Sequence, residues 1–324
     1  MDIFKKTYFE KKVKLENGYD GDICLKVDYA NIKNDGYMVQ GFTFVKEYII
    51  ISAYHKVSFC KGKSRIYFYS VKTGKYLGFV ELDNSAHVGG VTYDKEKDVL
   101  FVTGSYGKVN AYCMNSLIKA LKKEGKLIKY DSSNIDISLV LVCNVSAATI
   151  YFFEGNLYVA TCSNVGKVVK YTIRYDEKKI LVDKYQIISD APACIQGICL
   201  FNYKDKRYYL FSQSYGKSKS TIKVLDEEFK FLGQVTLTVP GIEGIDITCD
   251  ANIYGVFENS RTKVLCIPLV KLTHKINTQL EKKYISSGKI HQNILDARDK
   301  IIWKYWIIWD LWYYIVIFSM KDSK

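Results

Sequence analysis

A two-part hydrophobic pattern recurs along this chain: a small residue followed by a short apolar or aromatic run, then a turn and a second apolar run. The first copy occupies residues 41–44 and 48–52, and later copies begin at residues 90, 149, 197 and 244. The steps between copies are therefore 49, 59, 48 and 47 residues. Runs rich in β-branched and aromatic residues predict half-buried strands. A near-constant repeat of this length, built of strands, predicts a β-propeller.

Five copies predict an all-β, five-bladed propeller, with six blades as the alternative. We expect an N-terminal segment at 1–36, the propeller at 37–270 and a tail at 271–324. Only three strands are visible in the fifth copy, so its fourth strand should come from the N-terminus, from either 23–27 or 36–39. Such closure removes the exposed edges of the first and last blades.

Two kinds of turn refine this prediction. The turn Lys72-Thr73-Gly74-Lys75 predicts a hairpin. Gly107, Gly166 and Gly216 recur after the second strand of their repeats, which predicts turn positions with positive φ.

The second repeat is longer than its neighbours because it contains an insertion. Within residues 115–123, apolar residues at 117, 118 and 121 alternate with lysines, which predicts a short amphipathic helix. Asn115 or Ser116 is the expected N-cap.

The tail differs abruptly from the repeats. Residues 271–304 carry eight Lys or Arg against three acids, and residues 301–320 contain all four tryptophans. Lys304 and Asp310 interrupt the apolar run, which makes a bilayer span costly. Three alternatives are left open: an anionic membrane surface contacted through 271–320, a packed or oligomerising helical appendage, or an unstructured or aberrant end.

Composition adds limits on the compartment and the partners. The chain of 324 residues has a formal net charge of +13, but its lysines alternate with apolar residues throughout, so we find no specific nucleic-acid signal. Its nine cysteines form no CxxC pair, which favours a reducing compartment. No signal-peptide pattern is visible at residues 1–14. We expect a cytoplasmic or membrane-associated protein, or an extracellular one if a leader is missing.

Candidate ligand-binding residues lie where the innermost strands should begin and where the second strands should end. These positions line the funnel of a propeller and are mostly polar or aromatic, which suits a neutral polar ligand. The candidates are Gln40, Tyr54, His87, Tyr106, Gln196, Tyr215, Glu243 and Glu258.

Catalysis is the competing interpretation. Glu243 and Glu258 could act as a carboxylate pair with His87 as a base, as in a lactonase-like or glycan-directed hydrolase. A calcium site needs several oxygen ligands, usually including more than one carboxylate, and the only obvious acids, Glu243 and Glu258, both belong to the fifth repeat. We therefore expect neither a metal nor another cofactor, with calcium as the alternative. The chain holds no common catalytic motif.

The segments His87-Val88-Gly89-Gly90-Val91 and Glu243-Gly244-Ile245 resemble motifs of bacterial five-bladed propeller proteins of unassigned function, which are often secreted. The resemblance covers about residues 40–270 and implies architecture without catalytic residues. The expected function is therefore non-enzymatic binding or scaffolding, with a small polar ligand, a glycan or a peptide at the funnel. Whether the chain is an enzyme stays open, and the absence of a catalytic constellation favours binding.

Overall fold

The structure is a computed structural model of the whole chain. It describes residues 14–23, 26–56, 62–105, 108–123, 135–136, 149–161, 166–176, 179–214, 216–258 and 262–269. All of these belong to one compact unit, Lys11–Leu272. A second unit, Met1–Glu10 with Thr273–Lys324, lies outside the described residues. The three predictions for the tail concern residues of this second unit and stay predictions. Within the described residues, neither helix has the length and apolar character needed to cross a bilayer.

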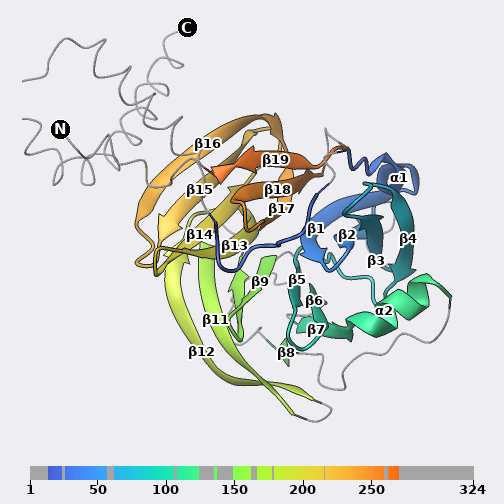
Figure 1. Cartoon of the computed structure of the whole chain (residues 1–324), viewed down its shortest axis with the longest axis horizontal. Coiled ribbons are helices and arrows are strands. Elements are labelled where there is room, and N and C mark those ends of the chain that lie inside the picture. The colour runs from blue at the N-terminus through green and yellow to red at the C-terminus, as the bar shows by residue number, and fades with distance from the viewer. Residues whose placement is uncertain are drawn as a thin grey trace, which may run out of the picture. The chain divides into compact units, whose positions relative to one another are not determined.

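Five antiparallel sheets surround one axis in the unit Lys11–Leu272, as Figure 1 shows. Blade one contains β1 (Tyr37–Val45), β2 (Tyr48–His55), β3 (Arg65–Ser70) and β4 (Tyr76–Glu81). Blade two contains β5 (Val91–Asp94), β6 (Val99–Thr103), β7 (Lys108–Cys113) and β8 (Ile135–Asp136). Blade three contains β9 (Thr149–Phe153), β10 (Asn156–Ala160), β11 (Gly166–Tyr175) and β12 (Ile180–Ala191). Blade four contains β13 (Ile195–Tyr203), β14 (Lys206–Gln213), β15 (Lys219–Asp226) and β16 (Phe231–Pro240). Blade five contains β17 (Ile242–Ile247), β18 (Asn252–Phe257) and β19 (Leu265–Pro268).

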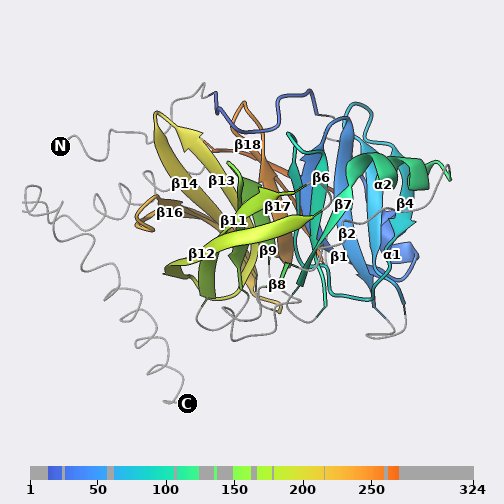
Figure 2. The same cartoon turned by 90° about the horizontal axis from the view of Figure 1, so that it is seen from below.

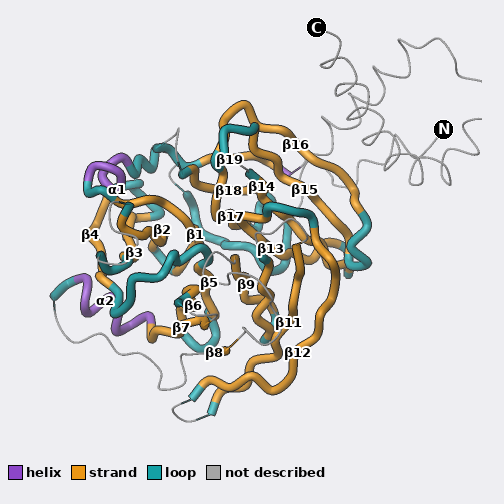
Figure 3. Tube along the Cα trace, turned by 180° about the vertical axis from the view of Figure 1, so that it is seen from behind, coloured by secondary structure: helices purple, strands orange, loops and turns teal. Residues whose placement is uncertain are grey.

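The predicted five-bladed propeller is confirmed, and the six-bladed alternative is wrong. The first strand of each blade is the innermost one, so β1, β5, β9, β13 and β17 contact one another in that order, and β17 returns to β1. Strands dominate the trace in Figure 3, with helix confined to two short segments of the described chain.

The small residue at the start of each repeat is explained by close approach between neighbouring blades. A Cβ added at Gly41, Gly90 or Gly197 would lie 3.0 Å or less from a backbone nitrogen of the next innermost strand. The same holds for Gly244, whose neighbour is the backbone of Phe42 in blade one. Since Cβ atoms do not fit at such distances, the glycines allow the innermost strands to pack tightly and the ring to close.

Apolar side chains fill the spaces between neighbouring blades. One cluster joins blades one and two and includes Ile50, Phe68 and Leu100; another joins blade one to Tyr254 and Val256 of blade five. All five side chains are at most 5% exposed. Burying such side chains contributes about 1.5–3 kcal/mol each, so packing between blades supplies much of the stability.

The predicted amphipathic helix is present as α2 (Met114–Leu121), and Figure 2 shows it beside β4. Its apolar side packs on blade one, where Leu121 lies over Gly78 of β4. The predicted cap is wrong: Cys113 is the N-cap, and it makes no side-chain capping hydrogen bond. Because β7 runs directly into the helix, Asn115 and Ser116 fall inside its first turn.

The N-terminal segment lies along blade five. The backbone of Tyr29 donates to the Thr262 carbonyl at 2.8 Å, and Asp28 forms an antiparallel bridge with Lys263, just before β19. The alternative closing run, 36–39, instead enters β1 as the innermost strand of blade one. The short helix α1 (Ala30–Asn34) connects these two parts of the chain.

The prediction of positive φ at the repeated glycines is confirmed at one position and wrong at another. Gly216 has φ +53 as predicted, and Gly74 of the predicted hairpin has φ +69. Gly166 lacks positive φ and begins β11, where a Cβ would collide with the Pro192 carbonyl. Packing therefore explains the glycine at this position. Gly107 lies outside the described residues.

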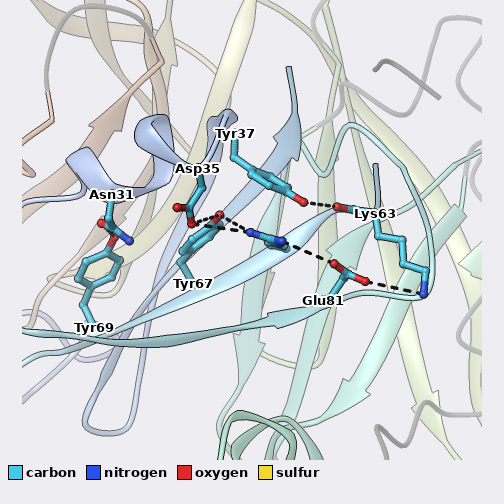
Figure 4. Close-up of polar contacts among 8 residues, drawn as sticks. Asn31, Asp35, Tyr37, Lys63, Tyr67, Tyr69 and Glu81 are labelled. Atoms are coloured by element: carbon cyan, nitrogen blue, oxygen red, sulfur yellow. Dashed lines mark hydrogen bonds and ion pairs between the residues drawn. The ribbon is translucent and has the colours of Figure 1, made fainter. Parts of the chain in front are cut away.

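A polar and aromatic network ties the outer strands of blade one to α1 (Figure 4). The Arg65 guanidinium lies 4.3 Å from the Tyr37 ring centroid and 3.9 Å from that of Phe79. Tyr67 donates a hydrogen bond of 3.3 Å to Asp35, next to α1. These contacts anchor α1 at the start of β1.

Candidate functional site

Three predicted site residues occupy equivalent positions on the innermost strands. We call the first residue of each repeat its anchor, which is Gly41, Gly90, Thr149, Gly197 or Gly244. Gln40, Gln196 and Glu243 each directly precede an anchor, and the strand register shifts at each of these points. The three shifts are β-bulges, in which an extra residue is inserted opposite the neighbouring strand. Because a bulge redirects the local side chain, blades one, four and five present a polar side chain at the same place. We call this end of the propeller, where the innermost strands begin, the funnel face.

The two glutamines use their amides on nearby backbone. Gln40 is 3% exposed, and its Nε2 donates to the Val39 carbonyl at 2.7 Å. The Nε2 of Gln196 donates to the Ser214 carbonyl at 3.5 Å. Gln40 is therefore held close to its own strand, whereas the half-buried Gln196 makes a longer contact.

Tyr54 and His87 form a stacked pair between blades one and two. Their ring centroids are 4.3 Å apart, and the ring planes differ by 28°. Burial lowers the pKa of His87 to about 4, so its imidazole is neutral near pH 7. Burial raises the pKa of Tyr54 to about 12, and the charges of Glu258 and Glu243 contribute to that shift. Tyr54 therefore stacks on His87 of blade two and lies within electrostatic range of two acids of blade five.

Glu243 is the most deeply buried acid of this group, with 3% of its surface exposed. Burial raises the pKa of its carboxyl well above the usual value, and the negative charge of Glu258 adds to the effect. Glu258 follows β18, and its backbone N–H donates to the Gly241 carbonyl at 2.7 Å. Burial lowers the pKa of Lys33 in α1, and the charge of Glu258 opposes that shift, so Lys33 lies near Glu258. Tyr54 thus contacts His87 directly, and the charges of Glu243 and Glu258 act on Tyr54.

The remaining two predicted site residues, Tyr106 and Tyr215, lie outside the described residues. Among described residues, no group of three or more His, Cys, Asp or Glu side chains is arranged to hold a metal ion.

A buried polar hub on the innermost strands was missed by the sequence reasoning. Asp246 of β17 accepts hydrogen bonds from Thr43 Oγ1 at 2.9 Å and from Tyr151 OH at 3.2 Å. It also accepts backbone bonds from Phe44 at 3.0 Å and from Ile247 at 2.8 Å. Blades three and five are not neighbours, so the bond from Tyr151 to Asp246 crosses the propeller axis.

In each blade, the residue two positions after the anchor lies at the same level along the propeller axis. These residues are Thr43, Thr92, Tyr151, Cys199 and Asp246, and each has at most 8% of its surface exposed. Burial raises the pKa of the Cys199 thiol well above its usual value, and the charge of Asp246 adds to this. The available sequence signal was a side chain with a hydroxyl, thiol or carboxyl group at this position of every repeat. The hub therefore occupies the axis below the funnel face.

The fold and this face define the protein as a five-bladed β-propeller with polar side chains at the starts of its innermost strands. The WD40 domain of Neurospora crassa Pan2 is structurally similar with a TM-score of 0.36 and 12% identity, over 72% of this chain and 62% of that chain. The RRP9 WD40 repeats give a TM-score of 0.40 and 11% identity, over 79% of this chain and 99% of that chain. This chain thus covers less than two thirds of the Pan2 chain. Similarity this low carries no functional argument.

No protein-family model matches the sequence. No curated protein matches it either. The geometry of the funnel face is therefore the basis for assigning a function.

Proposed function

We propose that this protein is a non-enzymatic binding or scaffolding propeller whose funnel face takes a small polar ligand, a glycan or a peptide. The observation that carries the proposal is the repeated bulge at Gln40, Gln196 and Glu243. Bulges are over-represented beside functional sites because they redirect side chains. Three bulges at one level give the funnel face polar groups drawn from separate blades.

The Tyr54–His87 stack supports the same proposal. A neutral imidazole and a phenol ring offer a flat apolar surface next to polar side chains, which is the usual composition of a ligand site. The two rings come from different blades, so a ligand resting on them would also bridge the blades.

The test is a ligand screen read by two-dimensional NMR on the full chain. Peptides, glycans and small polar molecules should shift resonances of residues at the funnel face, and Tyr54→Ala should weaken that binding. Tyr185→Ala is the matched control, because Tyr185 lies on the outer strand β12 and is 57% exposed. Shifts confined to outer strands, or equal weakening by both variants, would overturn the proposal.

One observation favours a hydrolase as the second candidate. Glu243 has a raised pKa and lies near a second carboxylate, Glu258, which is how a general acid and its partner are arranged in glycosidases. Turnover of lactones or nitrophenyl glycosides that is lost in Glu243→Gln would support it. Turnover that survives this substitution would exclude the pair as its source.

A further inference from the structure

The outer strand of blade three, β12, exposes a run of side chains along the middle of its length. Residues 183–187 are all exposed, and two of them are large and apolar: Tyr185 is 57% exposed and Ile187 is 50% exposed. Among the described strands, only β11 pairs with β12, which stands at the end of its sheet. Figure 1 and Figure 2 show β12 on the rim of the propeller, away from the axis. A strand edge of this kind offers backbone N–H and C=O groups to another chain.

The middle of β12 is regular, which suits pairing with a further strand. Residues 184–187 follow β11 without a shift in register, from Lys184 opposite Thr172 to Ile187 opposite Val169. The register shifts on either side of this stretch. Because bulges bend and twist a strand edge, the regular stretch between them is the part of β12 that another strand can join.

The outer strands of blades one and four present different edges. In β4 the register shifts at Leu77, and Gly78 has φ +141, so the edge is irregular where its apolar side chains are exposed. In β16, which is nearly as long as β12, no large hydrophobic side chain is exposed. Among the described outer strands, β12 therefore combines a regular edge with exposed apolar side chains.

We propose that two copies of this protein pair through their β12 strands in an antiparallel arrangement, with a two-fold axis at Gln186. This interaction surface is separate from the funnel face and goes beyond the proposed function. A two-fold axis makes the same patch of both copies meet, so the patch must be self-complementary. With the axis at Gln186, Tyr185 of each copy lies directly opposite Ile187 of the other, on one face of the joined sheet.

This register is the one that best matches the side chains of β12. Aromatic and β-branched side chains that lie directly opposite each other stabilise antiparallel strands, whereas like charges destabilise them. An axis at Lys184 would place two lysines opposite each other, and an axis at Tyr185 would place Ile187 opposite Asp183. Of the registers centred on residues 184–187, the one centred at Gln186 pairs each exposed apolar side chain with an apolar one of the other copy.

The charges along this edge favour a second copy over a strongly charged partner. Asp183 pairs with Arg174 at 3.1 Å, so Lys184 is the one further charged residue of the exposed run 183–187. A polyacidic or polybasic partner would find little charge to match, whereas a second copy brings the same apolar pair. The net charge of +13 repels a second copy at long range, but salt screens this repulsion beyond about 8 Å at physiological ionic strength.

The experiment is sedimentation-velocity analysis of the full chain over a range of concentrations. We expect the paired edges to bury less than the roughly 1,200–2,000 Å² of a standard interface, so the dimer should dissociate on dilution, at roughly 1–100 µM. It should strengthen as salt is raised, because screening weakens the repulsion between copies. Ile187→Lys should weaken it at least about tenfold, since the two-fold axis introduces the unpaired charge twice. Thr236→Lys is the matched control, because it adds the same charge at an exposed position of the outer strand β16.

A double variant tests the register. Tyr185→Glu combined with Ile187→Lys places opposite charges across from each other in both pairs, so it should associate more tightly than Ile187→Lys alone. If it does not, the axis at Gln186 is wrong. Tyr185→Lys keeps the test decisive should Ile187→Lys fail to fold, which circular dichroism checks.

Three results would overturn the proposal. A native protein that stays monomeric up to about 200 µM, above the range expected for a weak dimer, would leave the edge of β12 to a different partner. Association that Ile187→Lys does not weaken, or that Thr236→Lys weakens equally, would arise elsewhere on the chain. Growth beyond a dimer would exclude the two-fold pairing, because that pairing uses up the edge of both copies.

Discussion

Replacing Asp246 with Asn tests whether the buried hub holds the blades together. One carboxylate oxygen accepts from Thr43 Oγ1 and the Phe44 N–H, and the other from Tyr151 OH and the Ile247 N–H. An amide has one accepting oxygen and one NH₂ group. The hydroxyl groups can rotate and accept from the NH₂, but a backbone N–H cannot reverse its direction.

In the Asp246→Asn variant, one backbone N–H faces an NH₂ group whichever way the new amide is turned. An unsatisfied buried donor costs about 1–3 kcal/mol, and the other bonds lose their charge-assisted part. The cost of burying the carboxylate is recovered, which offsets part of this loss. We therefore expect the free energy of unfolding to fall by about 2–4 kcal/mol.

Urea unfolding followed by circular dichroism measures this change. Asp183→Asn is the matched control, because Asp183 is half exposed and pairs with Arg174 on the surface at 3.1 Å. An exposed ion pair of this kind contributes about 0–1 kcal/mol. If Asp246→Asn proves as stable as the native protein, the bonds across the axis do not hold the ring together.

Three further predictions concern the funnel face and the ring. The pKa of Glu243 is higher in the folded protein than in the unfolded chain, where it is about 4.3. The free energy of unfolding should therefore fall as the pH rises from the unfolded pKa to the folded pKa. Because glutamine does not ionise, the stability of Glu243→Gln relative to the native protein should be greater at pH 8 than at pH 5. Equal differences in the free energy of unfolding at the two pH values would contradict this. His87 has a pKa of about 4, below its unfolded value of about 6.5, so stability should fall as pH drops through that range, and an NMR midpoint near 6.5 would refute this. Gly41→Ala should cost about 1–3 kcal/mol through overpacking, because the added Cβ would lie 2.9 Å from the Val91 nitrogen; an unchanged midpoint of thermal unfolding would contradict the close-approach argument.

The blade repeat could be predicted because its cause is local and occurs in nearly every copy. Gly41, Gly90, Gly197 and Gly244 each meet the next innermost strand at the same point, so the requirement appears as a fixed spacing in the sequence. The strands that follow are apolar because both faces of each blade are covered. Neither property depends on knowing how distant blades are aligned.

The hub and the stacked pair could not be predicted in the same way. The bond from Tyr151 to Asp246 joins residues 95 positions apart in blades that are not neighbours. The stack of Tyr54 on His87 depends on where the loop before β5 enters the ring. The cap of α2 failed for a simpler reason: β7 continues directly into the helix, so Cys113 takes the cap position.

Two positions of the repeat differ in how their side chains are engaged. The residue two places after each anchor carries a hydroxyl, thiol or carboxyl group in all five blades and is buried at the axis, where Asp246 accepts four hydrogen bonds. The residue before the anchor sits in a bulge in blades one, four and five, and there only blade five carries an acid, Glu243. The first position therefore joins blades through hydrogen bonds on Asp246, whereas at the second position burial and the charge of Glu258 raise the pKa of Glu243.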